Sequence, residues 1–269
     1  MAVLFPPIKV RWGTREVPWT WVPANVREMA EAARPVFAEF LGTLSFVFLA
    51  GSLLVHIADR VHGSVGLLTI ALGTALAYGI IVSVFHPFSG GHINPAVTLG
   101  VMAARRLPPV EGLLYILGQM AGGLLGALML NFVYRGMVPD AARSAALVFG
   151  DRYHGSWAAL FTGGFLEAVL TFLLVLTFLS TLVDSRGQRA FGGLAVGLVV
   201  FVAMLLAFPL TGSALNVARV FATAAVANYW ADFAMYWLGL AGGLIAGLVY
   251  GLVLAEREQP EAGRPETIR

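Results

Sequence analysis

Two short segments of the chain carry side-chain amides in closely related settings. Ser89–Ala96 reads SGGHINPA and contains Asn94, while Thr211–Ala218 reads TGSALNVA and contains Asn216. An amide is not a nucleophile or a proton donor near neutral pH, but it both donates and accepts hydrogen bonds. The two asparagines therefore indicate recognition of small polar molecules rather than bond-breaking chemistry.

Each asparagine is followed by about ten apolar residues, Pro95–Ala104 and Val217–Ala227, which are too few to cross a bilayer. We expect two re-entrant half-helices, each capped by its asparagine, with Pro95 at a first helical position. If the two half-helices enter from opposite sides, their N-termini meet at the midplane. The positive helix ends and both amides then face one shared space.

Three charged residues stand within otherwise apolar stretches. Glu39 and Glu167 each precede a threonine by four residues, Thr43 and Thr171, so each pair shares one helix face. We expect both carboxylates to accept hydrogen bonds from the backbone of the two asparagine loops. A proton relay is the alternative, because intramembrane carboxylates usually mark functional sites. Arg219 is the only cation expected at this depth.

Other kinds of site find no support in the sequence. The chain has no cysteine, and it has no nucleophile elbow or phosphate-binding loop. We expect no catalytic residue, metal or cofactor. His92 is expected to order the first asparagine loop, with a pH gate as the alternative. The other histidines lack metal-ligand spacing and are expected at interfaces or in loops: His56, His62, His86 and His154.

The composition explains how such residues can be held at depth. Of 269 residues, 58% are hydrophobic and 12% are charged, which excludes an ordinary soluble domain. The net charge of +2 gives no reason to expect a nucleic-acid partner. Six stretches are long enough to cross a bilayer as helices. These are Val36–Ile57, Val65–Phe85, Pro109–Tyr134, Trp157–Val183, Phe191–Leu210 and Asp232–Ala255.

The six spans form two halves that repeat one pattern. A glutamate lies in the first span of each half, and an asparagine loop follows the second. Three spans are an odd number, so the second half enters the membrane from the other side, which makes an inverted repeat. The third spans carry glycine ladders, which let helix backbones approach closely. The ladders are Gly118, Gly122 and Gly126, and Gly239, Gly243, Gly247 and Gly251.

Basic residues predict the orientation. With a cytoplasmic N-terminus, twelve Lys and Arg residues lie on the cytoplasmic side and four on the other. We therefore divide the chain into a cytoplasmic N-terminal segment (1–35), a first channel repeat (36–134) and an extracellular connecting loop (135–156). A second channel repeat (157–255) and a cytoplasmic tail (256–269) follow. Asn25–Ala33 has the composition of a short cytoplasmic helix.

The two asparagine segments resemble the signature loops of the aquaporin, or major intrinsic protein, family. The resemblance extends from about Val36 to Ala255 and includes the region around Glu39 and Glu167. Asn94, Pro95 and Ala96 match the family's Asn-Pro-Ala motif. In the second loop the motif reads Asn216, Val217 and Ala218, so the proline that presets the backbone φ angle is missing.

The resemblance implies an all-α membrane protein with six transmembrane helices and two half-helices. It also implies a homotetramer in the cell (inner) membrane, in contact with lipid, in which each subunit has its own pore. Such a pore passes water and small uncharged solutes and excludes ions and protons. In the family a four-residue filter narrows the pore. Its matching positions here are Thr74, Met204, Ser213 and Arg219, with Tyr78 as a substitute for Thr74.

Three further functions remain open at this point. The filter residues match neither strict water channels nor glycerol channels, so a glycerol- or urea-type facilitator with secondary water flux is one alternative. A proton-coupled secondary transporter would also use inverted repeats, and its flux would respond to a proton gradient. A structural membrane protein with a closed pore would assemble normally and conduct nothing.

Overall fold

A computed structural model describes residues 9–12, 15–18, 26–57, 63–135, 137, 140–147, 150 and 157–255 of the chain. The predicted cytoplasmic tail lies outside these residues. Six of the described helices are long and apolar enough to span a membrane, which confirms the predicted fold class. They are α1 (Val26–Ile57), α2 (Gly63–Ser89), α4 (Pro109–Val133), α6 (Trp157–Phe178), α7 (Arg189–Thr211) and α9 (Phe233–Val249). The spans of α6 and α9 extend beyond these helices, to Val183 and Leu254.

Shorter elements complete the fold. Two half-helices follow the asparagines, and a single turn, α5, lies in the connecting loop. Helices α6 and α9 each continue into a π-helical turn. The bounds of these elements are α3 (Pro95–Ala103), α5 (Ala141–Ser144), α8 (Val217–Ala227), η2 (Leu179–Val183) and η3 (Tyr250–Leu254).

The N-terminal region differs from its prediction in two respects. A two-stranded antiparallel sheet, β1 (Lys9–Trp12) and β2 (Arg15–Pro18), was not expected from the sequence. The short helix expected over Asn25–Ala33 is not separate, because α1 runs without a break from Val26 through Pro35 into the first span. Proline removes one backbone donor, but a helix of this length keeps its remaining hydrogen bonds.

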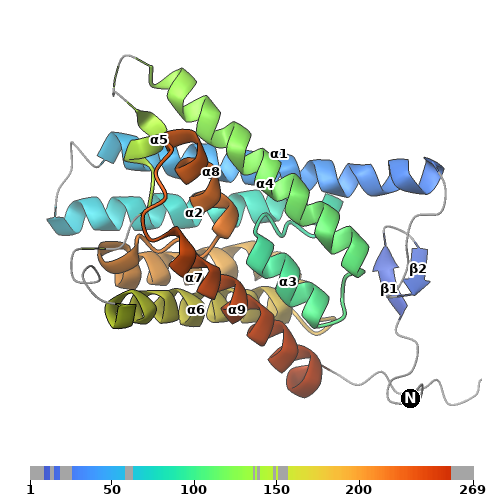
Figure 1. Cartoon of the computed structure of the whole chain (residues 1–269). Coiled ribbons are helices and arrows are strands. Elements are labelled where there is room, and N and C mark those ends of the chain that lie inside the picture. Colours follow the sequence, from blue (N-terminus) through green and yellow to red (C-terminus); the bar gives the residue numbers. More distant parts are fainter. Residues whose placement is uncertain are drawn as a thin grey trace, which may run out of the picture.

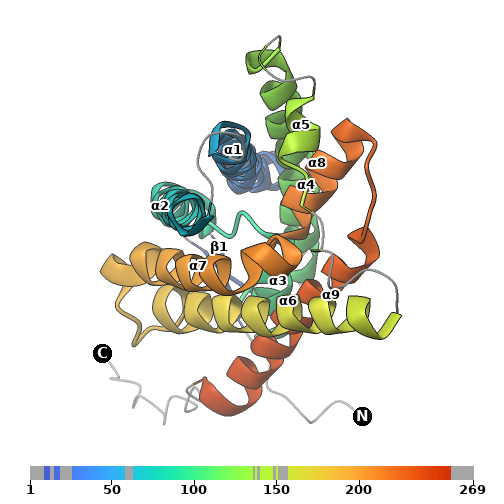
Figure 2. The same cartoon turned by 90° about the vertical axis from the view of Figure 1, so that its left-hand side faces the viewer.

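Both half-helices pack against α4 and α9 (Figures 1 and 2). Within the halves, α1 packs on α4 and α6 packs on α9, while α2 and α7 pack on each other between the halves. The half-helices are exchanged: α3 of the first half packs against α9, and α8 of the second half packs against α4. Neither half therefore encloses its own half-helix, and the site can form only when both halves are folded together.

Glycine makes the closest helix crossings possible. A Cβ atom on Gly122 would collide with the backbone oxygen of Phe40, and one on Gly242 would collide with that of Ala168. Phe40 and Ala168 directly follow the two intramembrane glutamates. These crossings therefore bring the glutamate-bearing helices α1 and α6 against α4 and α9.

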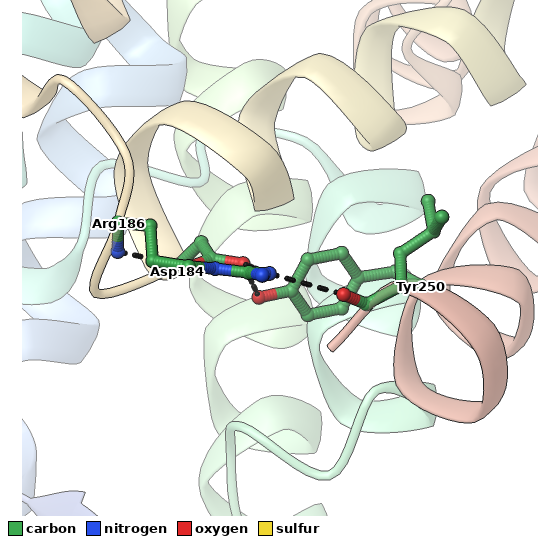
Figure 3. A network of polar contacts seen from close by, with 4 residues as sticks. Asp184, Arg186 and Tyr250 are labelled. Carbon is green, nitrogen blue, oxygen red and sulfur yellow. Dashed lines mark hydrogen bonds and ion pairs between the residues drawn. The ribbon is translucent and has the colours of Figure 1, made fainter. Parts of the chain in front are cut away.

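A polar clamp joins the ends of η2 and η3 (Figure 3). Asp184 receives hydrogen bonds from the Tyr250 hydroxyl at 2.8 Å and from Arg186 Nη2 at 2.7 Å. The Arg186 guanidinium also donates to the carbonyl oxygen of Leu254. Because the hydrogen bonds from Arg186 and from Tyr250 stabilise the carboxylate form, the pKa of Asp184 lies well below its usual range.

We expect Asp184→Asn to lower the stability of the folded protein by about 1–2 kcal/mol, a modest loss because the Arg186 side chain is 55% exposed. A depressed carboxyl pKa contributes stability above the unfolded value near 4 and loses it as the pH falls through the folded value. The difference in thermal unfolding temperature between the parent and Asp184→Asn, measured in detergent, should therefore be the same from pH 5 to 8. A difference that grows at acid pH would contradict this assignment.

Candidate functional site

The asparagines cap the two half-helices as the sequence predicts. Asn94 and Asn216 both have extended backbones, with φ of −153° and −142°. The Asn94 Oδ1 atom accepts a hydrogen bond from the Ala96 N–H at 2.9 Å, and the Asn216 Oδ1 atom accepts one from the Ala218 N–H at 3.0 Å. Each side chain thus satisfies one free donor at a helix start and fixes its own orientation.

The side-chain nitrogens of the two asparagines bind the opposite loops. Asn94 Nδ2 donates to the carbonyl oxygen of Leu215, and Asn216 Nδ2 donates to that of Ile93, both at 2.8 Å. These reciprocal bonds join the two half-helix N-termini at the centre of the molecule. An amide nitrogen carries two hydrogens, so each asparagine keeps one donor for another acceptor.

The carbonyl groups of Ile93 and Leu215 point toward the opposite asparagine because the backbone of both residues is in the left-handed region. Ile93 and Leu215 have positive φ angles of 46° and 53°. The left-handed region costs a bulky residue about 1–3 kcal/mol, most of all a β-branched one, and it persists only where surrounding contacts enforce it. Here the reciprocal asparagine bonds and the two glutamates supply those contacts.

Glu39 anchors the first loop. Its carboxylate oxygens accept hydrogen bonds from the backbone N–H groups of His92 at 2.9 Å and Ile93 at 2.6 Å. Ser89 and Gln119 donate to the same carboxylate from their side chains. This is the arrangement expected from the sequence for Glu39, and it engages both oxygens.

Glu167 anchors the second loop in the same manner. It accepts hydrogen bonds from the backbone N–H groups of Ala214 and Leu215, each at 3.0 Å, and from the Thr211 hydroxyl. The bonds of both glutamates thus go to groups that shape the loops. These contacts support the structural role over a proton relay.

Gln119 was not singled out from the sequence. It bridges Glu39 and the hydroxyl of Thr98 in α3, at 2.7 and 2.8 Å. The matching contact is missing in the second half, where Gly239 approaches Thr171 from α9. An isolated glutamine in an apolar span carries no sequence signal of such a bridge, although its polarity alone makes it unusual there.

His92 lies within the first loop and is 4% exposed. Its Nδ1 atom is 3.2 Å from the Thr98 hydroxyl, and its ring packs edge-on against Tyr115 and Phe178. These contacts on three sides support the loop-ordering role that the sequence predicts for His92.

A narrow cavity lies beside Asn216. Its volume is about 10 Å³, roughly the room that one water molecule needs, and it extends from Asn216 to Arg219. Its walls come from α1, α2, α6, α7, the second loop and the first turn of α8. The lining residues are Phe46, Tyr78, Leu174, Val200, Ser213, Ala214, Leu215, Asn216 and Arg219.

The four predicted filter residues differ in their relation to this cavity. Ser213 and Arg219 line it, whereas Thr74 and Met204 are fully buried one helical turn beyond it. On α2, Thr74 precedes the lining residue Tyr78 by four positions. On α7, Met204 follows the lining residue Val200 by four positions. Thr74 and Met204 therefore belong to an adjacent layer.

Several buried polar atoms in and beside this cavity have no hydrogen-bond partner among the described residues. They are Thr74 Oγ1, Tyr78 Oη, Ser213 Oγ and Arg219 Nη2. An unpaired buried polar group is costly unless water or a ligand satisfies it. The arrangement therefore suits polar molecules that occupy or cross this space.

Arg219 is 2% exposed and lies in the first turn of α8. Its Cζ atom is 5.8 Å from the centre of the Phe46 ring, and Glu167 interacts with it electrostatically. A buried cation needs such compensation. The positive end of α8 adds to the charge of Arg219 at this point of the site.

Placing proline at position 217 tests how much stability the protein loses by having valine there. Val217 is the first residue of α8, where a backbone N–H has no partner within the helix. We expect Val217→Pro to stabilise the protein by about 0.4–1 kcal/mol, because proline restricts the unfolded chain. Thermal unfolding in detergent measures this effect. As a control, Val220→Pro should destabilise, since the Val220 N–H bonds to the Asn216 carbonyl. A lower unfolding midpoint for Val217→Pro would contradict the expectation.

Known proteins resemble this chain over most of its length. The family model described as Major intrinsic protein matches residues 26–250. The chain is 39% identical to "Probable aquaporin TIP3-2" of Oryza sativa subsp. japonica, over 86% of this chain and 85% of that protein. It is 38% identical to "Aquaporin TIP4-4" of Zea mays, over 90% and 96% of the two chains.

A solved structure shares the fold. The aquaglyceroporin from Plasmodium falciparum superposes with a TM-score of 0.69 at 21% sequence identity, covering 82% of this chain and 96% of that one. Its identity is too low to carry more than the fold. The family match and the two plant relatives go further: this chain belongs to the major intrinsic protein family.

Proposed function

We propose that this protein is a passive channel for water and small uncharged solutes that excludes ions and protons. Membership of the major intrinsic protein family makes it a multi-pass channel protein and not an enzyme. The observation that carries the proposal is the reciprocal bonding of Asn94 and Asn216. It leaves a second amide donor on each asparagine for a molecule that passes between the half-helices, although the Asn94 side chain also interacts with the Tyr78 hydroxyl.

Selective passage follows from the same groups. A water molecule that leaves bulk solvent exchanges hydrogen bonds with the asparagine amides, with loop carbonyls and with the unpaired polar atoms of the cavity. A cation meets the positive ends of two half-helices and the buried charge of Arg219. The channel therefore compensates an uncharged molecule for its lost hydration and gives a cation no such compensation.

Assembly and location belong to the same proposal. We expect a homotetramer in the cell (inner) membrane, with both termini cytoplasmic. Large apolar side chains along α2 are about half exposed in the single chain, among them Leu72, Leu76 and Ile80 at 48%, 50% and 60%. Lipid or a neighbouring subunit would cover such a surface.

Stopped-flow shrinkage of proteoliposomes tests the proposal. Correctly inserted protein should raise osmotic water permeability well above that of empty liposomes, with a low activation energy. Val200 lines the cavity, so Val200→Trp should abolish the increase. Leu198→Trp places the same bulk on an exposed position of α7 and should leave it intact. Parent protein that behaves like empty liposomes would refute the proposal.

The predicted filter has its own test. Strict water channels of the family carry Phe and His at these two positions. Thr74 is smaller than Phe and Met204 is less polar than His, so a small uncharged solute should also pass. Uptake of glycerol, urea, ammonia and hydrogen peroxide should be compared in the parent and in a Thr74→Phe, Met204→His double variant. The double variant should pass less of whichever solute the parent admits. Equal uptake would remove both residues from the filter.

A further inference from the structure

Tyr78 occupies a central position in the cavity. It is 1% exposed, and it lines the cavity together with Asn216 and Arg219. Its ring packs edge-on against Phe46, with 5.0 Å between the centroids and an angle of 82°. An aromatic side chain in this place removes volume from the space between the cation and the asparagine pair.

The backbone beneath Tyr78 cannot move away from the cavity. The next residue, Gly79, lies where α2 crosses α7, and a Cβ atom there would be 2.6 Å from the Gly193 carbonyl oxygen. From the other side, a Cβ atom on Gly193 would be 2.7 Å from the Gly79 carbonyl oxygen. This close crossing and the Phe46 contact hold the ring of Tyr78 in place.

The hydroxyl group of Tyr78 is buried and has no hydrogen-bond partner of standard geometry among the described residues. The Asn94 side chain lies close enough to interact with it. A buried tyrosine hydroxyl usually finds a partner, because leaving it unpaired costs free energy. In this cavity a molecule in the channel can complete the hydrogen bonding of the hydroxyl, in competition with the Asn94 amide.

Tyr78 lies one helical turn away from two of the predicted filter residues, Thr74 and Met204. Thr74 lies four residues earlier on α2, about 6 Å along the helix axis at 1.5 Å per residue. On α7, Val200 and Met204 are likewise four residues apart. Thr74 and Met204 thus form one layer, Tyr78 and Val200 the next, and the asparagine pair a third.

We propose that Tyr78 forms a second selectivity layer between the predicted filter and the asparagine pair. This inference rests on the proposed channel function. The ring sets the upper size of the solute, and the hydroxyl is a hydrogen-bond partner for each molecule in single file. The layer suits compact uncharged molecules with one or two polar atoms, such as water, ammonia and hydrogen peroxide, and it excludes glycerol.

The absence of cysteine in this chain allows a direct test with Tyr78→Cys. In proteoliposomes this variant should raise glycerol permeability by roughly tenfold or more, equivalent to a barrier lower by about 1.4 kcal/mol. Methyl methanethiosulfonate should then reduce both water and glycerol flux, because the modified thiol lies in the channel. Ile80→Cys, on the exposed face of α2, is the matched control. Its glycerol permeability should equal the parent's, and the reagent should not reduce its water or glycerol flux.

Tyr78→Phe separates the ring from the hydroxyl and keeps the fold. It should still exclude glycerol, while its water permeability falls by roughly two- to tenfold through the loss of one hydrogen bond. Water flux equal to the parent's would overturn the role of the hydroxyl.

The remaining outcomes separate this inference from the channel proposal. A parent that conducts both water and glycerol freely, or a Tyr78→Cys variant that conducts water but still excludes glycerol, would overturn the role of the ring and leave the channel intact. A parent that conducts no water would overturn the channel and this inference together.

Discussion

An Arg219→Val variant is expected to conduct protons or small cations while its water permeability is retained. Arg219 is 2% exposed, so its charge acts in a medium of low dielectric constant. Removing it leaves the two half-helix ends as the main positive charges of the channel. Each 1.4 kcal/mol taken from the barrier raises the ion flux about tenfold, and we expect an increase of at least that size.

Proteoliposomes with an internal pH-sensitive dye and an imposed potential measure this leak, and stopped flow measures water in the same preparation. Arg189→Val is the matched control, because it removes a basic residue at the start of α7, away from the cavity lining. An Arg219→Val channel as tight to ions as the parent would mean that the half-helix ends suffice.

Glu39→Leu should prevent the protein from folding into a functional channel. Four donors would lose this acceptor: the two buried backbone N–H groups, the half-buried Ser89 hydroxyl, and Gln119, which keeps its bond to Thr98. Each unsatisfied donor costs about 1–3 kcal/mol, so the sum approaches the 5–15 kcal/mol by which folded proteins are typically stable. The left-handed conformation of Ile93 would also lose its support.

The yield of monodisperse protein in detergent and its thermal unfolding measure the effect. Thr43→Val is the control, because the buried Thr43 hydroxyl lies four residues from Glu39 and has no partner among the described residues. It should be nearly neutral. A Glu39→Leu protein that unfolds at the parent's temperature would contradict the structural role assigned to the carboxylate.

Local sequence rules determined much of the fold and of the site. Length and hydropathy placed the six spans. The capping preference of asparagine and the shortness of the segments that follow predicted the half-helices at Asn94 and Asn216, and the structure has both caps. The glutamate–threonine pairs marked the repeat, and burial of a carboxylate at depth required donors, which the loops provide. The spans and the caps depend on residues close together in the chain, whereas the donors that reach the glutamates lie 53 and 47 positions away from them.

Tertiary structure alone decided how these parts meet. Asn94 bonds to Leu215 across 121 positions, and Asn216 bonds to Ile93 across 123 positions. The exchange of the half-helices and the bridge made by Gln119 likewise depend on how the two halves pack. The sequence offered Tyr78 only as a substitute for Thr74 in the filter, and the structure places Tyr78 rather than Thr74 in the lining of the cavity. A helix pattern specifies which face is apolar, but which residues of that face border a cavity depends on helix crossings, here set by glycines in contact with distant backbone.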